Sequence, residues 1–182
     1  MNRSGNSRNA GKGERSDWQT PDYLFKKLDD IFMFTIDVAA NKDNAKCDIF
    51  INEKQDAFKT NWHTAPIRNS RFFLNMPWGR EYRKRTGIKP IDWVERLIDQ
   101  YRRGRNGVML CSASVNARWW QRAASYASII VFPAGRVNYT HPSAKLNQCN
   151  FDSTILVFHP MMLSRAIELL NKIGQVARFT DG

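Results

Sequence analysis

The chain has 182 residues, enough for one domain with a sizeable core, and 42% of them are hydrophobic, which excludes a disordered protein. Its net charge of +11, from 28 basic and 17 acidic residues, favours a polyanionic partner, with nucleic acid ahead of a membrane surface. No apolar run approaches the roughly 18 residues that span a bilayer, so no membrane-spanning helix is expected.

The cysteines and the histidines, three of each, are widely separated along the chain. This spacing predicts neither a disulfide framework nor a metal site, and it indicates reduced, buried thiols in a cytoplasmic protein. Residues 1–16 carry four basic side chains but no apolar core, so they are not expected to form a secretory signal. We expect a disordered basic arm there, which is either inert or adds non-specific phosphate contacts.

Residues 17–31 are expected to open the fold with a helix. Thr20 is a favoured N-cap residue and Pro21 suits the first helical position. Apolar residues then recur at helical spacing, and the helix should end near Asp30. Trp18, just before the cap, is interpreted as a hydrophobic plug over the start of the helix.

Residues 34–40 are expected to form a strand, and residues 47–51 a second one after a polar connector. The first strand ends in Asp37, which is followed closely by the small residues Ala39 and Ala40. Small residues let a ligand approach the backbone, and an acid at this place can hold a ligand amine or hydroxyl. The glycines of the standard dinucleotide fingerprint are absent.

Residues 55–62 are expected to form a short turn or helix that contains Asp56. Two interpretations of this carboxylate remain open. It accepts a hydrogen bond from an adenine amine, or it caps the helix that follows.

A short buried strand, Phe72 to Leu74, should end abruptly in the tetrad Asn75-Met76-Pro77-Trp78. Ligands of open α/β sheets collect outside the carboxyl ends of strands, so this end is the expected place of the chemistry. The tetrad resembles the Asn/Asp-Pro-Pro-aromatic signature of amino-group DNA methyltransferases, with Met76 in place of the first proline. This resemblance implies chemistry on the exocyclic amine of a base, which is a poor nucleophile because its lone pair conjugates into the ring. Two acceptors, the Asn75 side-chain oxygen and a backbone carbonyl, would draw that lone pair out of conjugation, and Trp78 would stack on a base rotated out of its duplex. The alternative is a turn in which Trp78 folds back as a core plug.

Residues 80–105 hold nine basic and four acidic residues. Three of the basic residues are expected in a glycine-bounded loop directly after the tetrad, where a positive loop would meet a substrate backbone. Pro90 should then open an amphipathic helix whose basic end also complements the helix dipole. The candidates for nucleic-acid contact are Arg83, Lys84, Arg85, Arg118 and Arg136.

The rest of the chain is expected to continue the alternation of strands and helices. Further strands should cover residues 108–111, 128–132 and 153–158, with helices beginning at the pair Trp119-Trp120 and at Pro160. One ring of the tryptophan pair should pack inward and the other should lie near the crevice, with a polar loop at residues 140–152. The alternation predicts a single α/β domain over residues 17–174, with a mostly parallel sheet, helices on both faces and a frayed tail at residues 175–182.

Taken in order, these motifs resemble the phage-type DNA adenine methyltransferase family, the small Dam-like enzymes of bacteriophages and prophages. The matching segments are Asp17-Trp18-x-Thr20-Pro21, residues 34–40, Asn44-Ala45-Lys46-Cys47, Asp56-Ala57, Trp62, the tetrad, Gly135-Arg136 and residues 153–158. The resemblance covers about residues 17 to 158, and the number of pieces in one order makes it specific.

The resemblance implies a Rossmann-like domain that uses S-adenosylmethionine and acts on double-stranded DNA, in a bacterial host cytoplasm if a phage encodes it. The cofactor would be bound by Trp18, Thr20, Pro21, Asp37, Ala39, Ala40 and Asp56. Asn75 and the Met76 carbonyl would polarise the adenine amine, and Trp78 would stack on the base, with no metal or covalent intermediate. Met76 departs from the family pattern, which has proline there, and so removes a restraint on the backbone angle φ.

Three alternatives remain beside DNA adenine methylation. The same chemistry would serve the amino group of cytosine, because the tetrad does not specify the base. A catalytically degenerate protein that keeps the fold and only binds DNA is the second alternative, and an RNA methyltransferase is the third. The sequence specifies neither a recognition site nor an oligomeric state.

Overall fold

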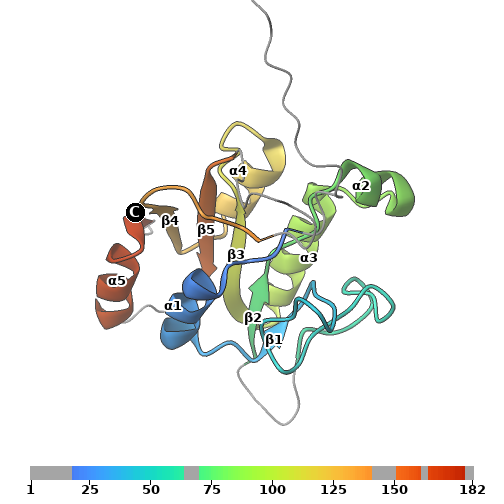
Figure 1. Ribbon diagram of the computed structural model, residues 1–182, viewed down its shortest axis with the longest axis horizontal. Coiled ribbons are helices and arrows are strands. Elements are labelled where there is room, and N and C mark those ends of the chain that lie inside the picture. Colours follow the sequence, from blue (N-terminus) through green and yellow to red (C-terminus); the bar gives the residue numbers. More distant parts are fainter. Residues whose placement is uncertain (1–17, 64–69, 141–150, 161–163, 179–182) are drawn as a thin grey trace, which may run out of the picture.

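The computed structural model describes residues 18–63, 70–140, 151–160 and 164–178 (Figure 1). The helices of these residues are α1 (Asp22–Phe32), α2 (Arg80–Thr86), α3 (Pro90–Arg102), α4 (Arg118–Ala124) and α5 (Ser164–Asn171). The strands are β1 (Ile36–Asp37), β2 (Arg71–Leu74), β3 (Asn106–Ser112), β4 (Ile129–Pro133), β5 (Ser153–Phe158) and β6 (Gly174–Arg178). The predicted arm at residues 1–16 and most of the predicted loop at residues 140–152 lie outside the described residues.

The strands form one mixed sheet in the order β1-β2-β3-β5-β4-β6. β1 is parallel to β2, and β2 is parallel to β3. β5 is antiparallel to both β3 and β4, and β6 is antiparallel to β4. It follows that β1, β2, β3 and β4 run in one direction, and that β5 and β6 run in the other.

The prediction of a mostly parallel sheet is therefore wrong: in the described residues three of the five neighbouring strand pairs are antiparallel. The physical reason is the position of β5. It enters between β3 and β4, so it separates two strands that run the same way and pairs in an antiparallel manner with both. Alternation of elements along the chain does not specify where a strand inserts into a sheet.

Helices cover both faces of the sheet, as predicted. Along β2, Phe72 and Leu74 point into a core shared with α3 and α4, whereas Phe73 points into a core shared with α1 and α5. Figure 1 shows α1 and α5 on one side of the sheet and α3 on the other. This alternation follows from the period of two along a strand, which sends successive side chains to opposite faces.

Helices α1, α3 and α4 begin close to the predicted places. Pro90 is the first residue of α3, and the backbone N–H of Lys89 donates to the Asp92 side chain at 2.7 Å. At α1 the N-cap is Pro21, without a side-chain cap hydrogen bond, so the prediction of Thr20 as the N-cap is wrong. The helix continues to Phe32, two residues beyond the predicted end.

Three segments differ from their predicted structure. Residues 47–51 do not form a strand but make a single parallel bridge, between Phe50 and Asp37, and β1 itself has only two residues. The segment with the three predicted DNA-contacting residues forms helix α2 instead of a loop. Gly174–Arg178, predicted as the beginning of a frayed tail, pairs with β4 as the edge strand β6. Among the described residues, no helix has the length and apolar character of a membrane span.

Candidate active site

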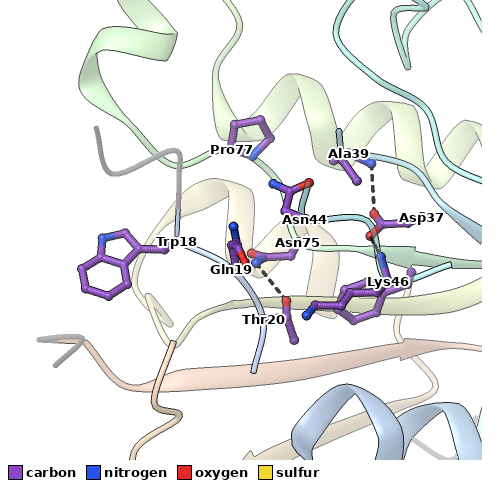
Figure 2. A pocket seen from close by; sticks show the side chains of 11 residues that line it. Trp18, Gln19, Thr20, Asp37, Ala39, Asn44, Lys46, Asn75 and Pro77 are labelled. Atoms are coloured by element: carbon purple, nitrogen blue, oxygen red, sulfur yellow. Dashed lines mark hydrogen bonds between the residues drawn. The ribbon is translucent and has the colours of Figure 1, made fainter. Parts of the chain in front are cut away.

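The carboxyl ends of β1 and β2 lie next to each other and open into a hollow (Figure 2). The parallel register pairs Asp37 with Phe73, so Asp37 and Asn75 lie at the carboxyl ends of two neighbouring strands, on the same side of the sheet. The hollow is lined by Trp18, Gln19, Thr20, Asp37, Ala39, Ala40, Asn44, Lys46, Phe73, Asn75 and Pro77. The structure thus brings together five of the predicted cofactor residues and two members of the tetrad.

The segment before α1 is held against this edge by backbone pairing. Gln19 donates from its N–H to the Thr140 carbonyl at 2.8 Å, and Thr140 donates back at 3.1 Å. This pairing places Thr20, which is buried, beside the end of β2. Thr20 is therefore part of the hollow, while Pro21 caps α1 and does not line it.

The side-chain amide of Asn75 is fixed from two sides. Its Nδ2 donates to Thr20 Oγ1 at 3.1 Å (Figure 2). Its Oδ1 accepts a hydrogen bond from the indole Nε1–H of Trp78 at 3.3 Å. Because an amide oxygen has two lone pairs, Oδ1 keeps one further acceptor position.

Asp37 is a buried carboxylate with only 4% of its surface exposed. Its two oxygens accept from the backbone N–H groups of Ala39, at 3.3 Å, and Lys46, at 3.1 Å. Burial raises the pKa of Asp37 to about 6, and the two backbone hydrogen bonds and the Lys46 charge oppose this rise. This group, which lines the hollow, therefore changes its charge near pH 6.

A second, larger hollow of about 390 Å³ continues from the first. The two share Ala39, Ala40, Asn44 and Pro77. The second is also lined by Asp56 and by apolar side chains from several elements, including Ile51, Phe58 and Trp93. Its size is in the range of a small-molecule site.

Asp56 lines this second hollow and also caps the turn that follows it. Its Oδ1 accepts from the N–H of Phe58 at 2.9 Å, and its own backbone has a φ of 61°. Left-handed backbone is tolerated by Asp because the short side chain makes local hydrogen bonds. In the structure, the Asp56 side chain therefore caps a turn.

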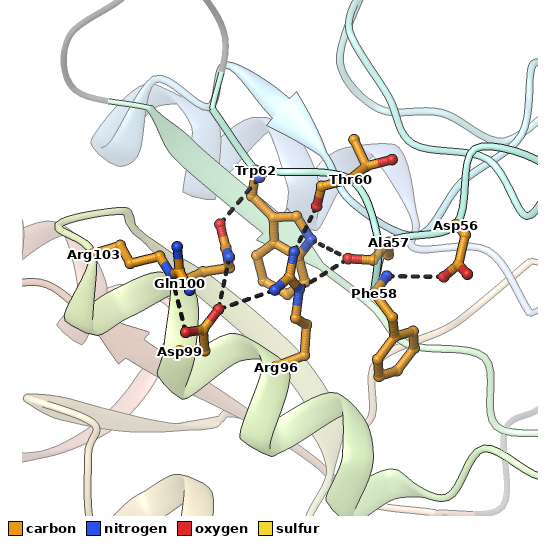
Figure 3. Close-up of polar contacts among 9 residues, drawn as sticks. All are labelled: Asp56, Ala57, Phe58, Thr60, Trp62, Arg96, Asp99, Gln100 and Arg103. Atoms are coloured by element: carbon orange, nitrogen blue, oxygen red, sulfur yellow. Dashed lines mark hydrogen bonds and ion pairs between the residues drawn. The ribbon is translucent and has the colours of Figure 1, made fainter.

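Helix α3 holds the turn at residues 56–62 in place (Figure 3). Arg96 donates to the carbonyls of Ala57, at 3.1 Å, and Thr60, at 2.7 Å. Gln100 accepts from the N–H of Trp62 at 3.1 Å. One wall of the second hollow is therefore fixed by side chains of a helix that lies behind it.

Of the other tetrad residues, Met76 and Trp78 pack against the core and Pro77 lines the hollows. The Met76 side chain is 1% exposed and belongs to the core shared with α3 and α4. Pro77 lines both hollows. Trp78 is partly buried against the same core and contacts Trp119, with ring centroids 5.2 Å apart. The prediction for the tryptophan pair is confirmed in part, since Trp120 packs inward.

The family model for DNA N-6-adenine-methyltransferase (Dam) matches residues 7–177 of the chain. The chain belongs to this family. Comparison with curated protein sequences finds no match. Family membership makes DNA the implied substrate and the N6 amine of adenine the implied acceptor of a methyl group.

The five residues predicted to contact DNA all follow the carboxyl ends of strands. Arg83, Lys84 and Arg85 lie on α2, which follows β2. Arg118 begins α4 after β3, and Arg136 follows β4. Because β2, β3 and β4 run in the same direction, their carboxyl ends lie on the side of the sheet where the hollow opens. All five predicted DNA-contacting residues follow these carboxyl ends.

Several of these groups also make ion pairs. Lys84 pairs with Glu81 at 3.1 Å, and Arg85 pairs with Glu53. Exposed ion pairs of this kind contribute little to stability, so they do not prevent contacts with phosphate.

The first hollow is lined by four residues that sequence analysis did not select as site residues: Gln19, Asn44, Lys46 and Phe73. Asn44 and Lys46 occur in a segment that the family resemblance includes, but their polar character alone predicts only a connector. Lys46 is held at the hollow by the hydrogen bond from its backbone N–H to Asp37, which lies nine residues earlier in the chain.

Proposed function

We propose that this member of the Dam family transfers a methyl group from S-adenosylmethionine to the exocyclic N6 amine of an adenine rotated out of duplex DNA. The placement of Asn75 carries the proposal. Its amide is fixed between Thr20 and Trp78 at the end of β2, beside the hollow that contains Asp37. A phage or prophage origin is part of the proposal and rests on the order of the sequence motifs.

The two joined hollows fit a ligand with an amino-acid part and a nucleoside part. Asp37 has acceptor capacity for a cationic amine, and Ala39 and Ala40 leave room for close approach to the backbone. Asp56 and the apolar wall of the second hollow suit an adenosine group. When bound, S-adenosylmethionine would supply an electrophilic methyl group on its sulfonium sulfur.

The protein's own contribution is to orient and polarise the adenine amine. The free acceptor position of Asn75 Oδ1 and the carbonyl of Met76 would accept the two amine hydrogens, which draws the nitrogen lone pair out of the ring. With the cofactor bound, the lone pair would form the new nitrogen–carbon bond, and the electron pair of the broken sulfur–carbon bond would remain on sulfur. The amine nitrogen then releases one proton to water. Trp78 would stack on the base.

The test is transfer of labelled methyl from S-adenosylmethionine to unmethylated duplex DNA, followed by analysis of the labelled base. We expect label on adenine, and we expect Asn75→Ala to lower the rate by at least about a hundredfold, as for loss of one group that stabilises transition-state charge. Asn171→Ala is the matched control, because Asn171 is an exposed residue at the end of α5. Its rate should equal that of the wild type.

The other outcomes separate the alternatives. Label on cytosine or on RNA would replace the proposed substrate while keeping the site. DNA and cofactor binding without any transfer would overturn the proposal and indicate a degenerate protein that binds DNA.

A further inference from the structure

Trp78 of the tetrad and Trp119 of α4 form a pair of indole rings beside Asn75. The ring centroids are 5.2 Å apart, and the planes are inclined by 55°. Both side chains are partly buried, and both pack against the core shared with α3 and α4. The pair joins two segments that follow the carboxyl ends of neighbouring strands, β2 and β3.

The two rings are held in different ways. The indole N–H of Trp78 donates to Asn75 Oδ1, which ties this ring to the amide. The backbone of Trp119 is fixed through its neighbour, because the buried Trp120 donates from Nε1 to Thr154 Oγ1 at 3.0 Å. Because this hydrogen bond holds α4 in place, a change in the position of the Trp119 ring would come from rotation of its own side chain.

We propose that Trp119 is a second aromatic contact for the target base, and that the base enters between Trp119 and Trp78. This inference rests on the proposed function. Two rings that sandwich a base lie about 7 Å apart, twice the 3.5 Å contact distance between carbon atoms. The observed centroid distance of 5.2 Å is too short and the inclination of 55° too large for this arrangement, so the rings must separate by about 2 Å and turn toward parallel when a base enters.

The arrangement assigns separate tasks to the two rings. Trp78 keeps Asn75 in orientation through its N–H while it offers one face to the base. In the free protein Trp119 contacts Trp78 at an inclination of 55°. When the base arrives, Trp119 exchanges one aromatic partner for another and contacts the base from the opposite side.

The kinetic test compares Trp119→Ala and Trp119→Phe with the wild type, using methyl transfer to unmethylated duplex DNA. We expect Trp119→Ala to lower kcat/KM for DNA about tenfold, as for loss of one stacking contact to a base. The dissociation constant for S-adenosylmethionine should remain unchanged. Trp119→Phe keeps an aromatic face and should stay within about threefold of the wild type.

A control separates contact with the base from support of α4. Tyr126 lies just after the other end of α4, and the guanidinium carbons of Arg102 and Arg122 lie 5.2 and 4.8 Å from its ring centroid. Tyr126→Ala removes aromatic packing at that end of α4 without reaching the tetrad. It should leave kcat/KM for DNA unchanged, and an equal loss in Tyr126→Ala and Trp119→Ala would overturn the inference.

A spectroscopic measurement follows the separation of the rings. Two indoles in contact give a coupled pair of circular dichroism bands, which Trp119→Phe should abolish in the free protein. We expect the bands of the wild type to disappear when duplex DNA and a non-reactive S-adenosylmethionine analogue are added together. Bands that persist in a complex able to flip its base would overturn the inference.

The two proposals fail in distinguishable ways. If the wild type transfers no methyl group, the proposed function falls, and the inference falls with it. If the wild type transfers methyl and Trp119→Ala is as efficient as the wild type, only the inference is overturned.

Discussion

The two halves of the sheet differ in strand direction and in chemistry. In the parallel half, β1 and β2 end in a hollow lined by polar groups, among them Asp37 and Asn75. In the antiparallel half, every residue of β5 is buried, and no residue of β5, β4 or β6 lines either hollow. The antiparallel half therefore supplies buried apolar surface, and the parallel half places the chemistry at its strand ends.

This contrast has a consequence for mutations. Changes in the antiparallel half should alter the free energy of unfolding and leave ligand affinity per folded molecule unchanged. Changes at the strand ends of the parallel half should alter binding or pH dependence. Substitutions that break this division would show that the two halves are coupled.

The largest expected effect is on stability, from Leu156→Ala in β5. Leu156 is fully buried between β3 and β4 in the core shared with α3 and α4. Loss of its side chain leaves a cavity and should lower the free energy of unfolding by about 3 kcal/mol. Urea denaturation measures this change, and the affinity of the folded protein for S-adenosylmethionine should stay the same. A weaker affinity per folded molecule would contradict the division between the halves.

The next effect concerns Asp37 and pH. Its pKa is about 6 in the folded protein against 3.8 for the free residue, so the native state holds its proton more tightly. The stability that this proton contributes is complete below about pH 3.8 and is lost as the pH rises through about 6. The loss amounts to roughly 3 kcal/mol at neutral pH, at 1.36 kcal/mol for each pKa unit.

Asp37→Asn isolates this contribution because it removes the titration and keeps the shape. Relative to the wild type, the variant should gain up to roughly 3 kcal/mol in unfolding free energy between pH 4 and pH 7, on top of a constant loss from one missing acceptor. Urea denaturation at several pH values gives the difference. A difference that does not change with pH would show that Asp37 does not titrate in this range.

The sequence predicted the buried strands well because apolar runs specify them without reference to partners. Phe72 to Leu74 and residues 153–158 were both identified in this way. Edge elements were harder to predict. Gly174–Arg178 is only partly buried and becomes a strand through pairing with β4, and α2 has a single buried side chain, Tyr82, and therefore no apolar stripe.

The candidate site was predictable where polar residues directly follow a buried strand. Asp37 and Asn75 are of this kind, and the structure places both in one hollow. Lys46 and Trp119 could not be assigned from the sequence. Lys46 is placed by a backbone hydrogen bond to Asp37, nine residues earlier in the chain, and Trp119 by a ring contact with Trp78 in a distant segment.

A smaller effect is expected from Arg96→Ala, which loosens one wall of the second hollow. Arg96 donates to two carbonyls of the turn at residues 56–62 and also pairs with Asp99 at 3.0 Å. Without it the turn should open more readily, and the affinity for S-adenosylmethionine should fall about tenfold, which corresponds to the loss of one or two hydrogen bonds to a charged group. Hydrogen exchange of the amides of residues 57–62 should become faster.

Arg103→Ala is the matched control for this prediction. Arg103 binds the other oxygen of Asp99, at 2.9 Å, and its exposed side chain does not contact the turn. This variant should leave both the hydrogen exchange of residues 57–62 and the affinity for S-adenosylmethionine unchanged. An equal effect of the two variants would show that the charge near Asp99, and not the contact with the turn, supports the wall.

The last prediction concerns the positive charge on α2, which follows the carboxyl end of β2. Neutralising Arg83, Lys84 and Arg85 to Gln should weaken DNA binding about tenfold. The slope of log affinity against log salt should flatten by roughly 2 to 3, since each lost phosphate contact removes about 0.9. Binding measured at several salt concentrations gives the slope.

As a control, neutralising Arg102, Arg103 and Arg178 removes the same three positive charges from the amino ends of the strands. Arg102 and Arg103 precede the amino end of β3, and Arg178 pairs with Ile129 at the amino end of β4. If DNA binds at the carboxyl ends of the strands, this control should change the slope much less than the α2 variant does. Equal slopes in the two variants would mean that net charge alone drives DNA binding, and they would remove α2 from the interface.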